Sequence, residues 1–140
     1  MSLSEEERNA LVFYKIQKSK DTFNEAVGIA QLCFWNAVAN RLYYASYYIT
    51  TALLVLYGHS AQTHSGVIRL FGLNFVNRGI VSKDMSKLYS KLFELRQTGD
   101  YDDLYNLTEE DVKPLIGLTQ HYINEIESLI ASRNNIEMKN

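Results

Sequence analysis

Apolar side chains recur every three or four residues along most of the chain, a spacing that predicts long amphipathic helices. The first helix is expected to begin at residues 4–7, SEEE, which have the spacing of a capping box. Its apolar face is predicted at Val12, Ile16, Ser19, Phe23, Ala26 or Val27, and Ala30. Lysines and Gln17 cover the other face, so the apolar face needs a partner.

A tight connection at residues 30–32 is predicted to send the chain back as a second helix that ends near Tyr57, before Gly58. This helix is apolar nearly all round, which is typical of a central position in a bundle or of a second face buried at an interface. Its core positions are expected at Phe34, Val38, Leu42, Ala45, Ile49, Ala52 or Leu53, and Leu56.

Three further helices are predicted in the second half of the chain. A short helix follows Ser65 and Gly66 and ends at Gly79. Its core-facing residues are expected to be Ile68, Phe71 and Phe75. The next begins near Ser82, is expected to end with a cap at Gly99, and carries Met85, Leu88, Leu92 and Leu95. After a loop at residues 100–107, the last begins at a capping sequence at Thr108, has Pro114 in its first turn, and carries Val112, Leu115, Thr119, Tyr122, Ile126 and Leu129.

These helices and short turns predict an all-α fold, an antiparallel up-and-down four-helix bundle with an additional short helix. No segment alternates in the way of a strand, and no repeat is visible. A single domain is expected over residues 1–140, with frayed ends at residues 1–3 and 134–140.

The charge, cysteine content and motifs of the chain exclude several classes of function. The net charge of -2 gives no overall attraction to nucleic acid, so any such binding must be local. The only cysteine, Cys33, excludes an intramolecular disulfide, and its apolar neighbours predict a buried, inert thiol. No residues have metal-ligand spacing or form a phosphate-binding glycine loop, so no metal or cofactor is expected. The absence of a secretion signal or membrane-spanning run favours a cytoplasmic protein without membrane contact.

Three stretches, in this order and spacing, together resemble the HEPN family, whose helical domains are often encoded beside a minimal nucleotidyltransferase. They are residues 36–45 (NAVANRLYYA), 64–71 (HSGVIRLF) and 92–101 (LFELRQTGDY). The resemblance covers nearly the whole chain and is closest to the branch with an R-x-Y-Y-A helix and an R-x-x-x-D-Y turn.

The resemblance implies a bundle of four or five helices, frequent homodimers, and a shared groove near the end of the motif helix. Catalytic members are metal-independent RNases with an R-x4-6-H motif, in which the arginine contacts the scissile phosphate and the histidine transfers protons. Here no histidine follows any arginine at that offset, and Tyr101 stands at the first allowed position after Arg96. A tyrosine hydroxyl, with an ordinary pKa near 10, is a poor base at neutral pH.

The best candidate site joins Arg96, Asp100 and Tyr101, because a guanidinium can hold a phosphate while a tyrosine stacks on a base. Arg41 and Tyr44 lie on one face of the second helix and are expected to border the same groove. The structural alternative is that Asp100 pairs with Arg96 or Arg41 while Tyr101 packs over the helix end.

Other aromatic and histidine positions have a similar choice of roles. Tyr43, Tyr44, Tyr47 and Tyr48 are suited to packing in a core or dimer interface, with base stacking as the alternative. His64, alone in its part of the sequence, is expected to be structural or exposed.

Two functions from different classes follow. The first is a non-catalytic, homodimeric binding module that acts with a nucleotidyltransferase partner in a toxin-antitoxin or defence system and binds a nucleotide or RNA. The alternative is a metal-independent RNase toxin in which Tyr101 or His64 replaces the missing histidine.

Overall fold

The computed structural model describes residues 3–102 and 106–139, and side chains as far as residue 133. In this part of the chain every regular element is helical and none is a strand, so the all-α prediction is confirmed. The elements are α1 (Glu5–Ala30), α2 (Trp35–Leu56), α3 (His64–Phe71), a π-helical turn η1 (Gly72–Val76), α4 (Lys83–Tyr101), α5 (Glu109–Val112) and α6 (Pro114–Lys139).

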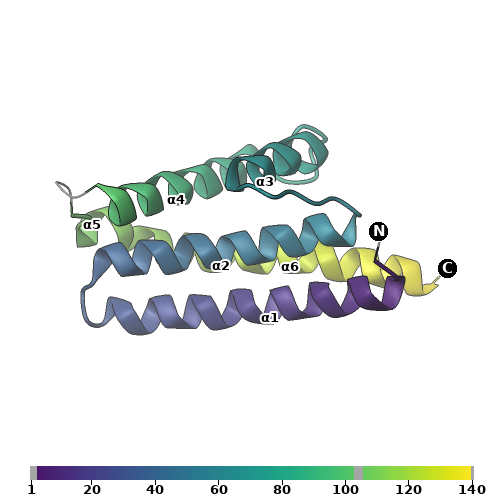
Figure 1. Cartoon of the computed structure of the whole chain (residues 1–140), viewed down its shortest axis with the longest axis horizontal. Coiled ribbons are helices and arrows are strands. Elements are labelled where there is room, and N and C mark those ends of the chain that lie inside the picture. Colours follow the sequence, from purple (N-terminus) through teal and green to yellow (C-terminus); the bar gives the residue numbers. More distant parts are fainter. Residues whose placement is uncertain (1–2, 103–105, 140) are drawn as a thin grey trace.

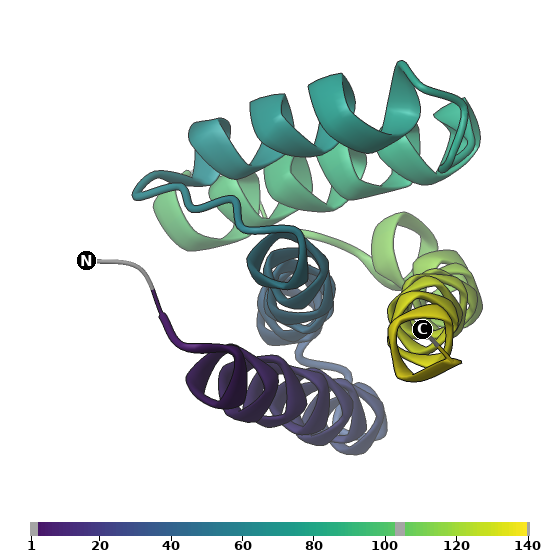
Figure 2. The ribbon, with the colours of Figure 1, turned by 90° about the vertical axis from the view of Figure 1, so that its right-hand side faces the viewer.

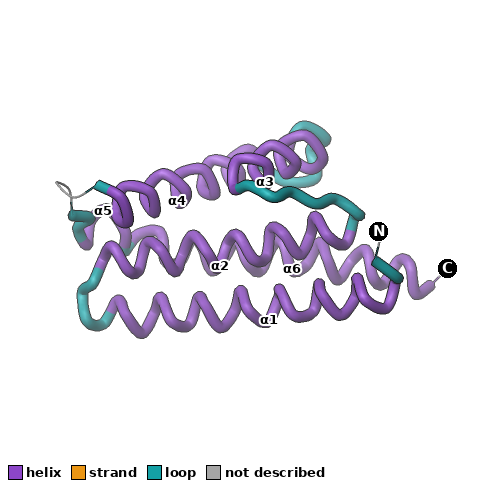
Figure 3. The backbone as a smooth tube through the Cα atoms, viewed as in Figure 1, coloured by secondary structure: helices purple, strands orange, loops and turns teal. Residues whose placement is uncertain are grey.

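The four long helices form an up-and-down bundle with α2 at its centre (Figure 1). Successive long helices α1, α2, α4 and α6 run in opposite directions, and α2 packs against each of the other three. In the end view, α3 and α4 form a layer above α2, with α1 and α6 below and beside it (Figure 2). The connections between α1 and α2 and between α2 and α3 are short loops (Figure 3).

Side-chain caps fix the starts of α1, α4 and α5, as the sequence predicts. The Ser4 hydroxyl accepts from the Glu7 N–H while the Glu7 carboxylate accepts from the Ser4 N–H, which completes a capping box. Ser82 caps α4, and a second capping box at Thr108 begins α5. Gly58 follows α2 with φ +81°, a backbone conformation that glycine adopts without strain.

The apolar stripe predicted for α2 forms the core, with one exception. Its members from Val38 to Leu56 are buried, whereas Phe34, predicted as the first of them, is 61% exposed. Phe34 is the N-cap residue of α2 and belongs to the turn, so the helical spacing does not yet apply to it.

Three local predictions are wrong. Cys33 is exposed and has φ +62°, because it lies in the tight reversal between α1 and α2 and not in a helix. Gly99 does not cap α4, which continues to Tyr101; the glycine lies where a Cβ atom would come 3.1 Å from Leu107 Cδ1. Pro114 begins α6 after a break at Lys113, so the predicted last helix is two elements, α5 and α6.

The chain ends and the loop after α4 are tested only in part. Residues 1–2, 103–105 and 140 lie outside the described residues, and the single domain with frayed ends at 1–3 and 134–140 stays a prediction. Within the described helices, none is long and apolar enough to cross a membrane.

Hydroxyl groups tie α2 to its neighbours inside the core. Thr50 Oγ1 and Tyr122 Oη lie 2.6 Å apart, both residues are fully buried, and Thr50 also donates to the Ser46 carbonyl at 2.7 Å. Ser19 of α1 donates to the Ala45 carbonyl of α2 at 2.6 Å. These bonds satisfy polar groups that would be costly if left without a partner.

The pair that joins α2 to α6 gives a test of this packing. Tyr122→Phe removes a hydroxyl but leaves Thr50 bonded to Ser46, so the free energy of unfolding should fall by about 1 kcal/mol. Thr50→Val leaves the Tyr122 hydroxyl in the core without its hydrogen-bond partner, so the free energy of unfolding should fall by more, about 2 to 3 kcal/mol. Urea unfolding of both variants and of the double variant measures these free energies and shows which single variant is less stable. A Tyr122→Phe variant less stable than Thr50→Val would contradict this account.

Candidate functional site

Arg96 is buried in α4 among aromatic rings. Its side chain lies between α4 and α2, and the residue is only 5% exposed. Four rings surround the guanidinium carbon at 5.0 to 5.8 Å, and they belong to Tyr43, Tyr44, Phe93 and Tyr101. Rings offer a cation their negative faces, which partly compensate for the loss of water.

The polar partners of Arg96 are few and distant. Nη1 lies 4.0 Å from Asp100 Oδ2 and 3.5 Å from Tyr101 Oη. Nε is buried and has no hydrogen-bond acceptor among the described residues. A buried guanidinium is stable when it has close anionic acceptors, so this environment suits an added phosphate or carboxylate group.

Asn40 links Arg41 to this arrangement. Its Oδ1 accepts from Arg41 Nε and Nη2 at 3.0 and 2.7 Å, and its Nδ2 donates to Asp100 at 2.9 Å. Arg41 also pairs with Glu25 of α1 at 3.3 Å. Of the two structural alternatives for Asp100, the pair with Arg96 is present at 4.0 Å, whereas Asn40 occupies the position between Asp100 and Arg41.

Tyr44 completes the group predicted from the sequence. Its ring lies 5.5 Å from the guanidinium carbon of Arg41 and 5.6 Å from that of Arg96. The structure thus brings together all five predicted site residues, which we call the Arg96 cluster: Arg41, Tyr44, Arg96, Asp100 and Tyr101. Their part in binding a ligand stays a prediction.

His64 lies against the same rings. Its Nδ1 is 2.6 Å from Tyr43 Oη, and its ring centre is 4.9 Å from that of Tyr47. It shares with Arg96 three ring neighbours: Tyr43, Tyr44 and Phe93. Sequence reasoning treated this histidine as isolated, because its neighbours come from α2 and α4.

Two supporting residues were missed at the sequence level. Asn40 immediately precedes Arg41 in the motif stretch, and Phe93 lies one helical turn before Arg96, a spacing that places it on the same face. Among the described residues, no group of three His, Cys, Asp or Glu side chains is arranged to hold a metal ion.

The environment sets the protonation of His64 and Tyr43. Burial, followed by the nearby Arg96 cation, lowers the pKa of His64 below its ordinary value. Burial raises the pKa of Tyr43 to about 12. At neutral pH His64 is therefore neutral and Tyr43 keeps its proton, so their short hydrogen bond joins two uncharged groups.

A family model described as HEPN domain matches residues 14–129, which is most of the chain. The chain belongs to the HEPN domain family. A UPF0332 protein of Thermotoga maritima is 35% identical over 124 residues, covering 89% of this chain and 94% of its own. A Methanocaldococcus jannaschii protein named "Putative toxin MJ0605" is 31% identical over 121 residues, covering 83% of this chain and 89% of its own.

A solved structure shares the fold of this chain. The crystal structure of TT1696 from Thermus thermophilus superposes with a TM-score of 0.71 at 15% identity, covering 84% of this chain and 96% of that one. A second Methanocaldococcus jannaschii protein, named "Putative toxin MJ0142", is 22% identical and covers 89% of this chain and 85% of its own. Two of these relatives, both from Methanocaldococcus jannaschii, are thus named as toxins.

The position of His64 beside Arg96 predicts a measurable titration. In the folded protein the His64 pKa should lie below its ordinary value, and Arg96→Gln should raise it because a nearby positive charge is removed. Below the ordinary histidine pKa, the unfolded chain binds a proton that the folded chain resists, so this residue should lower stability as pH falls. NMR titration of the His64 imidazole signals in the wild type and in Arg96→Gln checks both pKa statements. A His64 pKa unchanged in Arg96→Gln would contradict the proximity of the two groups.

Proposed function

We propose that this HEPN domain binds a phosphate-containing ligand, a nucleotide or RNA, at the Arg96 cluster and does not cleave it. The observation that carries the proposal is the Arg96 guanidinium, which is buried among four rings and has only one described carboxylate, at 4.0 Å. A phosphate oxygen at Nη1 would supply the close anionic acceptor, while the exposed ring of Tyr101, 72% accessible, offers a face for a base.

The absence of turnover is supported by the groups that surround Arg96. No histidine occupies the R-x4-6-H offset, and Tyr101 in its place is a poor proton acceptor at neutral pH. Asp100 is held by Asn40 at 2.9 Å, an arrangement that orients the carboxylate and suits a structural role.

The biological setting that we propose is a toxin-antitoxin or defence system. The relatives named as toxins support this setting. The family resemblance adds a homodimer and a nucleotidyltransferase partner encoded nearby. Light scattering on the purified chain tests the dimer, which a compact monomer at micromolar concentration would contradict.

Substitution of Arg96 tests the binding proposal. Arg96→Ala should weaken binding of an RNA oligonucleotide by roughly tenfold to one-hundredfold, because a charge-assisted contact to phosphate is lost. Arg96→Lys keeps the charge but loses the paired donors of the guanidinium, so its affinity for the RNA should lie between those of the wild type and of Arg96→Ala. Fluorescence anisotropy measures the affinity, and Arg69→Ala, at an exposed arginine of α3, is the matched control. Equal loss in the Arg96 and Arg69 variants, with both folded by circular dichroism, would contradict the proposal.

A second candidate function is favoured by the position of His64. A metal-independent RNase needs a group that exchanges protons near neutral pH beside the arginine that contacts phosphate. His64 meets this need through its place against three of the rings around Arg96. For Nε2 of His64 to accept a proton, Nδ1 must be protonated and donate a hydrogen bond to Tyr43 Oη. The 2.6 Å separation of Nδ1 and Oη permits this bond.

Incubation with RNA separates the two candidates. We expect the wild-type chain to bind single-stranded and structured RNA and leave both intact on a denaturing gel. Cleavage that persists with a metal chelator, and that disappears in both Arg96→Ala and His64→Asn, would establish the RNase instead. His121→Asn, at an exposed histidine of α6, is the matched control for the histidine variant.

A further inference from the structure

Contacts around Arg96 continue onto α1 through a row of rings and cations. The Tyr44 ring lies 5.6 Å from the Arg96 guanidinium carbon and 6.1 Å from the Tyr48 ring. Lys18 Nζ lies 5.3 Å from the centre of the Tyr48 ring and 5.7 Å from that of Tyr14. We call this row the aromatic strip; its members, in order from α4 through α2 to α1, are Tyr101, Arg96, Tyr44, Tyr48, Lys18 and Tyr14.

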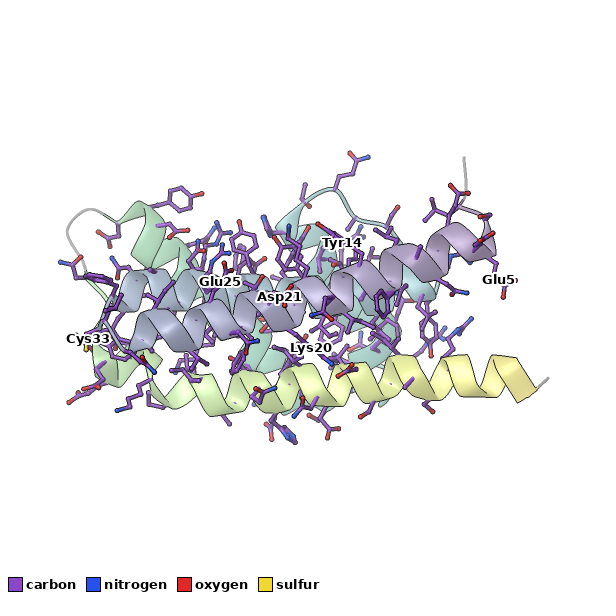
Figure 4. The ribbon with its side chains drawn as sticks, turned by 90° about the horizontal axis from the view of Figure 1, so that it is seen from below. Glu5, Tyr14, Lys20, Asp21, Glu25 and Cys33 are labelled. Carbon is purple, nitrogen blue, oxygen red and sulfur yellow. The ribbon has the colours of Figure 1, made fainter. Side chains whose placement is uncertain are left out.

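Both ends of the aromatic strip are open to solvent. Tyr101 is 72% and Tyr14 is 56% exposed, so both rings are open to a ligand. Between them, Tyr44, Tyr48 and Lys18 are partly exposed, whereas Arg96 is buried beneath the rings. Figure 4 shows Tyr14 on the edge of α1 that faces away from α6, whereas Lys20 points toward α6. The strip therefore lies on the side of α1 away from α6.

A groove of about 470 Å³ accompanies the α1 end of the strip, a volume in the range of ligand sites. Its lining comes from α1 and α2 and includes Tyr14, Lys18, Asp21, Glu25, Arg41 and Tyr48. Glu25 pairs with Arg41, and Asp21 accepts a hydrogen bond from Gln17 at 3.0 Å. Both carboxylates of the groove thus have partners within the protein.

Lys18 differs from Arg41, the other cation that lines the groove, in having no carboxylate partner among the described residues. Its ammonium donates to Tyr14 Oη at 3.3 Å and pairs with no carboxylate of the described residues. That hydrogen bond raises the pKa of Lys18, so the group stays charged at any physiological pH. A cation between two aromatic rings at the edge of a groove is arranged for a phosphate flanked by bases.

We infer that the aromatic strip binds a single-stranded polynucleotide several residues long, with one phosphate at Lys18 and bases against Tyr48 and Tyr14. This rests on the proposed function, because the same strand would place another phosphate at Arg96. The alternation of cations and rings favours a polynucleotide over a protein partner, since every nucleotide supplies an anion and a stacking face. With a net charge of -2, the chain has no general attraction to nucleic acid, so affinity should depend on these local contacts.

The length of the ligand tests the inference. Fluorescence anisotropy is measured with RNA and DNA oligomers of about eight nucleotides and the same sequence, and adenosine monophosphate is measured by calorimetry. Lys18→Gln should weaken octamer binding roughly tenfold and reduce the slope of log affinity against log salt by about 0.7. Tyr48→Leu, which keeps an apolar side chain, should weaken it between about fivefold and one-hundredfold. Binding of the mononucleotide should be unchanged in both.

Lys20→Gln is the matched control, because it removes the same charge from the same helix. Lys20 pairs with Glu127 of α6 at 2.8 Å, away from the strip. Equal effects of Lys18→Gln and Lys20→Gln on the octamer, or none from Lys18→Gln and Tyr48→Leu, would overturn the inference. Thermal unfolding of each variant shows that the fold is intact.

The Arg96→Ala variant distinguishes failure of the inference about the aromatic strip from failure of the proposed function. If Arg96→Ala weakens both ligands while Lys18→Gln and Tyr48→Leu weaken neither, only the inference is wrong. If the wild type binds adenosine monophosphate but no oligomer, again only the inference is wrong. If Arg96→Ala changes neither ligand, or the wild type binds neither, the proposed function is wrong as well, and a protein becomes the occupant to test. Binding of either octamer that both Lys18→Gln and Tyr48→Leu weaken supports the inference, and the comparison of RNA with DNA shows whether the ribose 2′-hydroxyl is contacted.

Discussion

Burial of α2 on nearly all sides is the constraint on which the rest of this HEPN domain depends. Because α1, α4 and α6 all pack against it, most of its side chains must be apolar or must find partners inside the protein. The Thr50 and Ser46 hydroxyls find them in the core, and Arg41 and Asn40 find them at the end near α4. The same helix therefore supplies both much of the core and two of the five residues of the Arg96 cluster, Arg41 and Tyr44.

Much of the fold follows from helical spacing and from caps, since both are local. The capping boxes at Ser4 and Thr108 and the buried stripe from Val38 to Leu56 are set by residues three or four positions apart. Predictions failed where tertiary contacts decide, as at Gly99, which lies inside α4 and, lacking a side chain, allows Asn36 and Leu107 to come close. They failed also at the α1–α2 turn, where apolar neighbours suggested burial of Cys33 and helical spacing suggested burial of Phe34.

The candidate site was predictable to the extent that its residues lie close in the sequence. Arg96, Asp100 and Tyr101 share one helix end, and Arg41 and Tyr44 are one turn apart, so their grouping follows from helix geometry. The bridge through Asn40 and the approach of His64 depend on how α2, α3 and α4 pack together, which no short-range pattern records. His64 is consequently the residue whose role changed most once the fold was known.

Cys33, with its left-handed backbone, marks the centre of the α1–α2 hairpin, and the cross-helix pairs are arranged symmetrically about it. Glu25 and Arg41, Lys18 and Tyr48, and Lys15 and Thr51 each stand equal numbers of positions before and after this residue. One inserted or deleted residue in the turn would rotate one helix by about a quarter of a turn relative to the other. It would separate all three pairs at once, so the length of this reversal is as much a part of the surface chemistry as any side chain on it.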